Sequence, residues 1–387
     1  MAEDETPNPF SNPLFAQFQR AMSAQGPLQW DVARQTALMA ATQGTTEHNV
    51  DPQRRIAVES LAAVAQMHAA EVTGREILNI GKLEVVARAT WVNMTLDSWK
   101  PYFDALAHAI GGAPEETPDD DTADPMMKML ASVSKMIAPS MLGMSVGTLV
   151  GRLAVNTFGQ FDLPLPREPH GKLVIVIGNV DNFADEWSIP RDDMTMWALL
   201  HELVSSAVFG VDHVRDTLQK LVISFASGFR PNPAAFSDSI GQLDVSSGDP
   251  MKILDSLLSD PTVLLGAQRS GAQDQIAPTL DAAVAAIVGY VDHCVDRASA
   301  RVLGEGSRIA EAVRRRRVAQ SGDRVFVERL LGLDLTTERV SLAQQFVAGV
   351  IDRAGEAGLS QLIEKPGNLP TPAEIVAPGL WLARLEG

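Results

Sequence analysis

The sequence predicts a mainly α-helical protein with one small β element, and three observations support this. Apolar residues recur at i, i+3 and i+4 over long stretches of the 387-residue chain, which is the spacing of amphipathic helices. Alanine and valine are abundant and only 5% of the residues are aromatic, a composition that favours closely packed helices. A single β-branched apolar run, at 173–177, follows a proline-rich stretch and is typical of a strand.

The first half of the chain is predicted to be helical, with one break. We predict helices, in chain order, at 26–41, 58–78, 98–112 and 126–159. Asp97, Ser98 and Pro101 mark the start of the third helix. The acidic, proline-rich stretch 113–126 is predicted to be a loop. In the fourth helix, three glycines share one face and should allow another helix to approach closely; they are Gly143, Gly147 and Gly151.

The second half is predicted to consist of the strand and further helices. A helix over 188–210 follows the strand, with Ser188 or Asp192 as its cap and Gly210 at its end. Residues 230–282 are rich in Gly, Ser, Asp and Pro and contain one clear helix. We expect the remaining helices at 277–299, 323–333 and 338–355, followed by a short closing piece.

Composition excludes some classes of partner. Apolar residues make up 45% of the chain and charged residues 21%, as expected for a globular protein with a core. The net charge of −16 repels phosphate backbones, so we expect no nucleic-acid partner. The basic run Arg314–Arg317 is interpreted as a solvated helix face or helix end. Cys294, the single cysteine, can form no internal disulfide and is expected to be a small buried hydrophobe.

The N-terminal residues do not resemble a targeting segment. Residues 1–26 are acidic and proline-rich, unlike a signal peptide, and are predicted to form a flexible tail. Residues 27–387 are predicted to form a single multi-helical domain. No uninterrupted apolar run approaches the roughly 20 residues needed to cross a bilayer, and one of the longest candidates contains Arg152. We therefore expect a cytoplasmic protein without a membrane partner.

The stretch "LLHELVSS" at 199–206 begins like the helix of a zinc peptidase, H-E-x-x-H. In that motif the i, i+4 spacing places two imidazoles on one face, where both bind Zn²⁺, and the glutamate activates a metal-bound water. Here His201 and Glu202 match the motif, but Ser205 replaces the second histidine. Serine is a poor zinc ligand. A His-Glu pair alone is equally typical of an ordinary helix with a partly buried histidine.

Other histidines do not complete the motif in an obvious way. An extended zinc motif would have its third histidine at position 211, which is Val211; His213 is interpreted as a surface histidine. Near the end of the helix at 277–299, Asp292, His293 and Asp296 lie close in sequence. Helical spacing leaves two interpretations open for them: ligands of a metal, or solvated and salt-bridged side chains.

Several stretches, in this order and spacing, resemble the actinobacterial zincin-like family labelled DUF2342. Its members are also described as zinc-dependent metalloproteases or as coenzyme F420 biosynthesis-associated proteins. The similar stretches cover most of the chain and include "GPLQWDVARQTA", "LGMSVGTLVGRLAVNTFGQFDLPLP", "WALLHELVSSAVFGVDHVRDTL", "VGYVDHCVDRAS", "VERLLGLDL" and "LPTPAEIVAPGLWLARL". The resemblance implies a zincin-like metallopeptidase scaffold with its active-site-like core in 170–300. No glycine-rich phosphate loop supports a deazaflavin site.

The chain departs from this family at the positions that carry chemistry. The resemblance implies a Glu-Gly-His segment that supplies a third zinc ligand, where this chain has Val288, Gly289 and Tyr290. His201 is then the remnant of the metal site and Glu202 the remnant of the catalytic base. Zinc sites need three or four protein ligands, so we expect no zinc and no other cofactor.

These departures lead to three interpretations. The leading one is a pseudoenzyme with a binding, regulatory or scaffolding role and a protein or peptide partner in the former cleft. The alternative is a metallohydrolase with a rearranged zinc site that uses His201, Glu202 and either Asp292 or His293. The third is a structural protein whose cleft has closed. In each case we expect the strand at 173–177 beside the His201 helix and residues 288–296 facing that helix.

Overall fold

The computed structural model describes residues 26–75, 77, 82–111, 125–167, 172–230, 269–304, 306–318, 330–333 and 335–387, with 82, 125–137, 307, 317 and 318 as backbone only. The predicted tail lies outside these residues up to position 25. So do the predicted loop up to position 124, most of the region 230–282, and most of the helix expected at 323–333.

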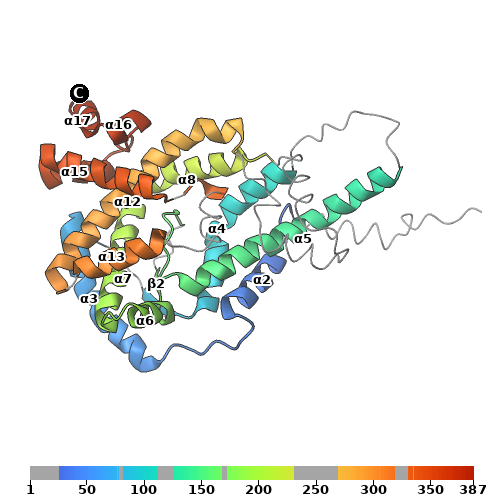
Figure 1. Ribbon diagram of the computed structural model, residues 1–387, viewed down its shortest axis with the longest axis horizontal. Coiled ribbons are helices and arrows are strands. Elements are labelled where there is room, and N and C mark those ends of the chain that lie inside the picture. Colours follow the sequence, from blue (N-terminus) through green and yellow to red (C-terminus); the bar gives the residue numbers. More distant parts are fainter. Residues whose placement is uncertain are drawn as a thin grey trace, which may run out of the picture.

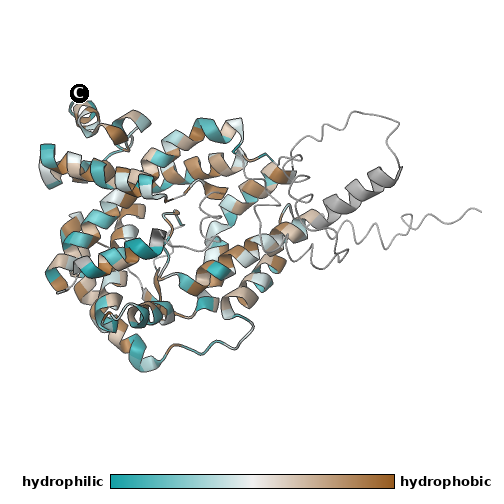
Figure 2. Cartoon of the chain, in the orientation of Figure 1, coloured by the Kyte–Doolittle hydropathy of each residue, from teal (hydrophilic) through white to brown (hydrophobic). Residues whose placement is uncertain are grey.

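The described part of the chain is predominantly helical, with one small sheet, as the sequence predicted (Figure 1). Its helices are α2 (Trp30–Thr42), α3 (Pro52–Thr73), α4 (Arg88–Gly111), α5 (Pro125–Asn156), α6 (Ile177–Glu186), α7 (Arg191–Phe209), α8 (Asp212–Ser227), α12 (Gly271–Val302), α13 (Gly306–Val318), α15 (Thr337–Ser360), α16 (Pro372–Val376) and α17 (Pro378–Glu386), with a 3-10 turn at Gln361–Ile363. Figure 2 shows hydrophobic and hydrophilic residues alternating along the same helices, as expected for helices with one buried side.

The sheet consists of two parallel strands, β1 (Lys82–Val86) and β2 (Lys172–Val176), with Val85 opposite Ile175. The predicted strand at 173–177 corresponds to β2, except that Ile177 already belongs to α6. Neither β1 nor α6 was predicted. A pair of short strands is only marginally stable alone, so burial supplies what local propensity does not: residues 173–176 of β2 are all buried.

Three helices start earlier than predicted: α3 begins at Pro52 rather than at residue 58, and α4 and α12 each contain an internal proline, a residue that is typical of a helix boundary. α4 begins at Arg88 rather than at residue 98, and Pro101 lies inside it. The Glu47 carboxylate accepts hydrogen bonds from the backbone N–H groups of Arg88 and Ala89, at 2.8 and 2.9 Å, and so caps this helix from a distant part of the chain. α12 begins at Gly271, with a capping box, and also contains a proline.

The glycine face of α5 packs directly on α2. A Cβ atom added to Gly143, Gly147 or Gly151 would lie only 2.4–2.6 Å from a backbone carbonyl oxygen of Gln29, Ala33 or Ala37. Side chains do not fit between backbones this close, so only glycine allows the approach. The close approach expected from the spacing of these glycines is confirmed.

By length and composition alone, the segment Ala138–Asn156 of α5 is long and apolar enough to cross a membrane. Arg152 lies inside this window, so the window is not an uninterrupted apolar run. Helices α7 and α8 meet the same criterion only as a pair bent by 89°. A core helix meets the criterion too, and 44% of the α5 window is buried.

Helix α7 is the element around which the site is built. It begins after Pro190 and ends before Gly210, close to the predicted bounds, although no side chain caps its start. It packs against α3, α6, α12 and β2, so the predicted neighbourhood of strand, His201 helix and residues 288–296 is confirmed. Arg54 of α3 helps to hold the start of α7, because its guanidinium bonds Asp181 at 2.7 Å and the Thr195 hydroxyl at 2.6 Å.

Candidate functional site

His201 and Glu202 lie in the middle of α7, and both are buried, with exposed fractions of 5% and 0%. The imidazole of His201 stacks on the indole of Trp197, one helical turn earlier, at a centroid distance of 5.4 Å and an interplanar angle of 18°. The Nδ1 atom of His201 lies 3.5 Å from Oε1 of Glu202. The pair is therefore part of the packed interior.

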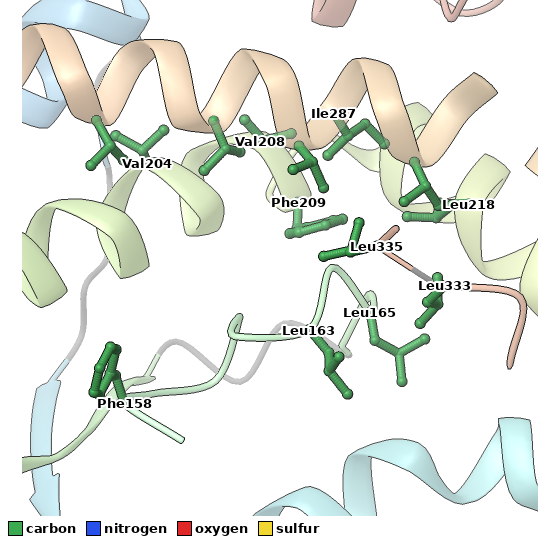
Figure 3. Close-up of a cluster of buried hydrophobic side chains, with 14 of the residues drawn as sticks. Phe158, Leu163, Leu165, Val204, Val208, Phe209, Leu218, Ile287, Leu333 and Leu335 are labelled. Atoms are coloured by element: carbon green, nitrogen blue, oxygen red, sulfur yellow. The ribbon is translucent and has the colours of Figure 1, made fainter. Parts of the chain in front are cut away.

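Positions 201, 205 and 288 meet at one cavity, as expected from the resemblance. We call it the His201 cavity; its volume is about 20 Å³. Its lining residues are Phe161, Asp162, Pro164, His201, Ser205, Phe209, Ile287, Val288, Val291, Asp292 and Leu335. Figure 3 shows that Phe209, Ile287 and Leu335 gather where their elements meet, with Leu163 and Leu165 on the loop below them. A cavity of this size holds about one water molecule, so side chains fill most of the space around His201.

Of the two residues considered as the further ligand of a rearranged metal site, Asp292 lines the His201 cavity. His293 instead faces α15, where its Nε2 lies 3.1 Å from a carboxylate oxygen of Glu356. Asp296 is paired with Arg314. His213, expected at the surface, is half-buried in α8, and its Nε2 has no hydrogen-bond partner within the described residues. The surface interpretation of His213 is therefore wrong.

The three positions that correspond to a zincin site do not supply a set of zinc ligands. Zinc sites in proteins use three or four nitrogen, sulfur or carboxylate ligands. The three positions that correspond to a zincin site supply one imidazole, one hydroxyl and one aliphatic side chain: His201, Ser205 and Val288. Across the described ranges, no group of three or more His, Cys, Asp or Glu residues is placed to hold a metal ion.

Glu202 holds a loop. Its carboxylate accepts hydrogen bonds from the backbone N–H of Gln160 at 2.7 Å and from that of Phe161 at 3.1 and 3.2 Å. Both donors belong to the stretch between α5 and β2, of which residues 157–167 are described; we call it the 157–167 segment. Glu202 does not line the His201 cavity. A residue that matches the catalytic base of a zinc peptidase therefore has a structural contact in this chain.

The same segment joins Glu202 to a buried arginine. The N–H of Phe161 and the carbonyl of Gln160 belong to one peptide group. This group donates to the Glu202 carboxylate, and its carbonyl accepts a 3.0 Å hydrogen bond from Nε of Arg167. One peptide group thus bridges two buried, opposite charges, which stabilises both charges in the interior.

Burial affects both ends of this bridge. It lowers the pKa of the Arg167 guanidinium to about 10, although the negative charge of Glu202 opposes the change. Burial also raises the pKa of the Glu202 carboxyl; the neighbouring His201 and the Phe161 N–H act in the opposite direction, and Asp162 raises it further. The guanidinium of Arg167 lies over the rings of Trp99 and Trp91, at 5.3 and 6.0 Å from the ring centroids.

Gly159 allows the segment to lie against Glu202. A Cβ atom added at this position would lie 2.4 Å from Cδ of Glu202. Its carbonyl accepts hydrogen bonds from Nε1 of Trp91, at 2.7 Å, and from the Thr157 hydroxyl, at 2.9 Å. A side chain at 159 would therefore collide with the carboxylate that fixes the loop.

The 157–167 segment also covers the second edge of β2. The N–H of Val176 donates to the carbonyl of Phe158 at 2.8 Å, and Gly159 forms an antiparallel bridge with Ile175. Because β1 occupies the other edge, β2 is paired on both sides. A free strand edge can bind an extended peptide by backbone pairing, but at Ile175 this edge is occupied by the chain itself.

The structure can be compared with the predictions for the arginine run and for the cysteine. Arg315 is exposed and pairs with Glu311, as expected of a solvated face. Arg316 is not solvated: its guanidinium lies 3.8 Å from the ring centroid of Phe158, and 3.3 Å from Asp162. Cys294 is buried as expected, and burial raises the pKa of its thiol to about 12.

Sequence reasoning missed Arg167, Trp91 and the role of Gly159. The only signal for them was that Gly159 and Asp162 belong to the stretch "NTFGQFDLPLP", which resembles the zincin-like family although it contains no catalytic motif. A buried arginine leaves no periodic pattern in the sequence. The contact between Gln160 and Glu202 joins residues 42 positions apart, so it is visible only in the fold.

Comparison with known proteins agrees with this scaffold. A solved structure from Chloroflexus aurantiacus, described as a candidate hydrolase with a novel fold, is 21% identical and covers 93% of this chain and 99% of its own, with a TM-score of 0.58. At this identity the similarity concerns the fold. No curated protein matches the chain. A family model described as zincin-like metallopeptidase matches residues 28–382, and the chain therefore belongs to this family.

Proposed function

We propose that this protein is a zincin-fold pseudoenzyme: it has lost the zinc site and acts by binding, in a regulatory or scaffolding role. The observation that carries the proposal is the use of Glu202. Its carboxylate is engaged by two backbone N–H groups of the 157–167 segment, and it does not line the cavity that contains His201. A general base must reach a water molecule beside the reacting bond, and a carboxylate held in this way is not available for that task.

The proposal includes a protein or peptide partner at the former cleft. In the described conformation such a partner meets a cavity of about 20 Å³ and a β2 edge that Phe158 and Gly159 already pair. Binding there would require the 157–167 segment to leave β2, which breaks its hydrogen bonds with Glu202. We expect this partner, if peptide-like, to bind slowly and to compete with the chain's own segment.

The proposal also covers the narrower family that the sequence resembles. We infer that this protein is a degenerate member of the actinobacterial family DUF2342, because its stretches 142–166 and 197–218 resemble that family. Cytoplasmic location also remains our expectation.

A second candidate function is a metallohydrolase with a rearranged site. The specific observation in its favour is that Asp292 and Asp162 line the same small cavity as His201. Against it, Asp162 is already bonded to the Phe158 N–H at 2.9 Å and to Arg316. Metal analysis of untagged protein purified without chelator separates the two. The pseudoenzyme should contain less than about 0.1 zinc per chain, since fewer than three ligands are present. Near-stoichiometric zinc that disappears in Asp292→Asn supports the second candidate.

Restoring the ligands tests whether the scaffold is that of a zinc site. The double variant Ser205→His with Val288→Glu supplies an imidazole and a carboxylate at the cavity that already contains His201. We expect saturating zinc to raise its melting temperature by about 5 °C or more, and to leave the wild type unchanged. The matched control is Ser205→His with Val288→Gln, which has the same size but lacks the third charged ligand. An equal response of all three proteins to zinc would contradict the assignment of these positions.

A further inference from the structure

A second and much larger cavity lies across the 157–167 segment from the first. We call it the Arg88 cavity; its volume is about 480 Å³, within the range of roughly 300–1,000 Å³ that is typical of small-molecule sites. Residues of α4, the end of α5, the 157–167 segment, α6 and α13 line it. Asp162 contributes to both cavities, so the segment forms a common wall.

Aromatic rings make up much of this lining. Trp91 and Trp99 meet edge to face, with ring centroids 6.2 Å apart and planes at 84°. Phe158 and Phe183 form a second such pair, at 5.2 Å and 66°. All four residues line the Arg88 cavity. Edge-to-face pairs of this kind give the cavity apolar aromatic walls that a flat apolar group can contact.

The charged groups in the lining favour an anion. Three arginines line the cavity, Arg88, Arg152 and Arg316, against two carboxylates, Asp162 and Glu186. Asp162 is already used by Arg316 and by a backbone N–H. In a chain with a net charge of −16, a cavity with more arginines than carboxylates is unusual.

Arg88 is the arginine whose partner is neutral. Its Nε donates to Oδ1 of Asn179 at 2.8 Å, and no carboxylate pairs with its guanidinium among the residues described. The nearby Glu47 carboxylate bonds the backbone N–H groups of Arg88 and Ala89, not the guanidinium. A guanidinium has five N–H donors, so most of those of Arg88 remain for a ligand.

Trp99 adds an independent observation that points to a ligand with a hydrogen-bond acceptor. It is 1% exposed and lines the cavity, and its Nε1 is buried without a hydrogen-bond partner in the described part of the chain. A buried N–H without a partner is unfavourable, and an acceptor brought next to it would remove that penalty. The guanidinium of Arg167 lies behind the same indole, 5.3 Å from its centroid, and adds positive charge to this wall.

We propose that the Arg88 cavity binds a small organic anion with a flat aromatic body. The aromatic body packs on the wall of Trp91 and Trp99, and the anionic group bonds the guanidinium of Arg88. Carboxylate and phosphate groups both match a guanidinium by paired, charge-assisted hydrogen bonds. The proposal does not depend on the fate of the zinc site, because no residue of the His-Glu pair lines this cavity.

The test uses the full chain and two probes of equal shape, 2-naphthoate and the neutral 2-naphthalenemethanol, in isothermal titration calorimetry. We expect the anion to bind about tenfold more tightly than the alcohol, the gain of a charge-assisted hydrogen bond over a neutral one. Arg88→Met should remove this preference and Arg88→Lys should restore most of it. Arg315→Met, which removes an exposed arginine outside the cavity, should bind both probes as the wild type does.

Val155→Trp tests the location without altering a charge, since Val155 lines the cavity and is half-buried on α5. A folded Val155→Trp variant, with a wild-type melting temperature, should bind naphthoate at least about tenfold more weakly because the indole fills the space. The proposal is overturned by equal affinity for the two probes, by no saturable binding to the wild type, or by wild-type affinity of the filled variant. An equal loss in Arg315→Met and Arg88→Met would also overturn it.

Discussion

The His201 cavity and the Arg88 cavity share a wall, yet they differ in volume and in chemistry. The first contains the residues that match a zinc-peptidase motif and has a volume of about 20 Å³. The second contains no motif residue and has a volume of about 480 Å³, with arginines and aromatic rings in its lining. The comparison teaches that a residue's match to a motif and its availability for chemistry are separate properties. In this chain, Glu202 matches the motif while its carboxylate holds the wall between the cavities.

The common wall depends on Glu202, and its removal should have the largest effect. In Glu202→Ala the buried N–H groups of Gln160 and Phe161 lose their acceptor, and Arg167 loses the charge that balances it. We expect a loss of about 3–5 kcal/mol in the free energy of unfolding, measured by urea denaturation. Ser205→Ala, one turn away and equally buried, should cost less than about 1 kcal/mol. Equal losses in the two variants would show that Glu202 does not hold the segment.

The second largest effect should come from the other side of the same contact. In Gly159→Ala the new methyl group would lie 2.4 Å from Cδ of Glu202, whose carboxylate is fixed by the backbone. We expect a loss of about 1–3 kcal/mol in the free energy of unfolding. The control is Gly178→Ala in α6, where an added Cβ meets nothing within 4 Å. This change should be neutral or should stabilise by up to about 1 kcal/mol, since alanine favours helix. The two glycines should therefore give changes of opposite sign in thermal or urea unfolding.

Two adjacent arginines of α13 allow a third comparison. The guanidinium of Arg316 stacks on Phe158 and bonds Asp162, both of the common wall. Among the residues that the structure describes, Arg315 pairs only with exposed Glu311. We expect Arg316→Met to lower the free energy of unfolding by about 1–2 kcal/mol, from the lost cation–π and ionic contacts. Arg315→Met should change it by less than about 0.5 kcal/mol. A similar effect of both would mean that α13 does not stabilise the wall.

Local patterns in the sequence predicted helices such as α2, α5, α7 and α15, but they predicted neither α6, α8 and α13 nor the wall. The glycines of α5 and the end of α7 at Gly210 follow from spacing and from backbone sterics, which depend on near neighbours in the chain. The start of α4 depends on Glu47, 41 positions away, and was missed. Positions 201, 205 and 288 were correctly expected together because the family resemblance carries long-range order. The bridge between Glu202 and Arg167 was not predicted, because it passes through a backbone peptide group, which every residue provides.

The smallest effect concerns the protonation of Glu202 and sharpens the account of the wall. Burial raises the pKa of this carboxyl in the folded protein above its value in the unfolded chain. Between the two values the folded state binds more protons at this site than the unfolded state. The part of the stability that comes from this pKa difference is therefore fully present below the unfolded pKa of Glu202 and is lost as the pH rises through its folded pKa. Glu202→Gln keeps an acceptor for the backbone N–H groups of the 157–167 segment and removes the titration. We expect the unfolding free energy of Glu202→Gln, relative to that of the wild type, to increase as the pH rises from about 4 towards 8.

Urea unfolding of both proteins across this pH range measures the difference, with Ser205→Ala as a control whose difference from the wild type should not depend on pH. A relative stability of Glu202→Gln that falls with rising pH would mean that Arg167 and the backbone N–H groups outweigh burial, and that the wall is held by an ionised carboxylate at every pH in the range.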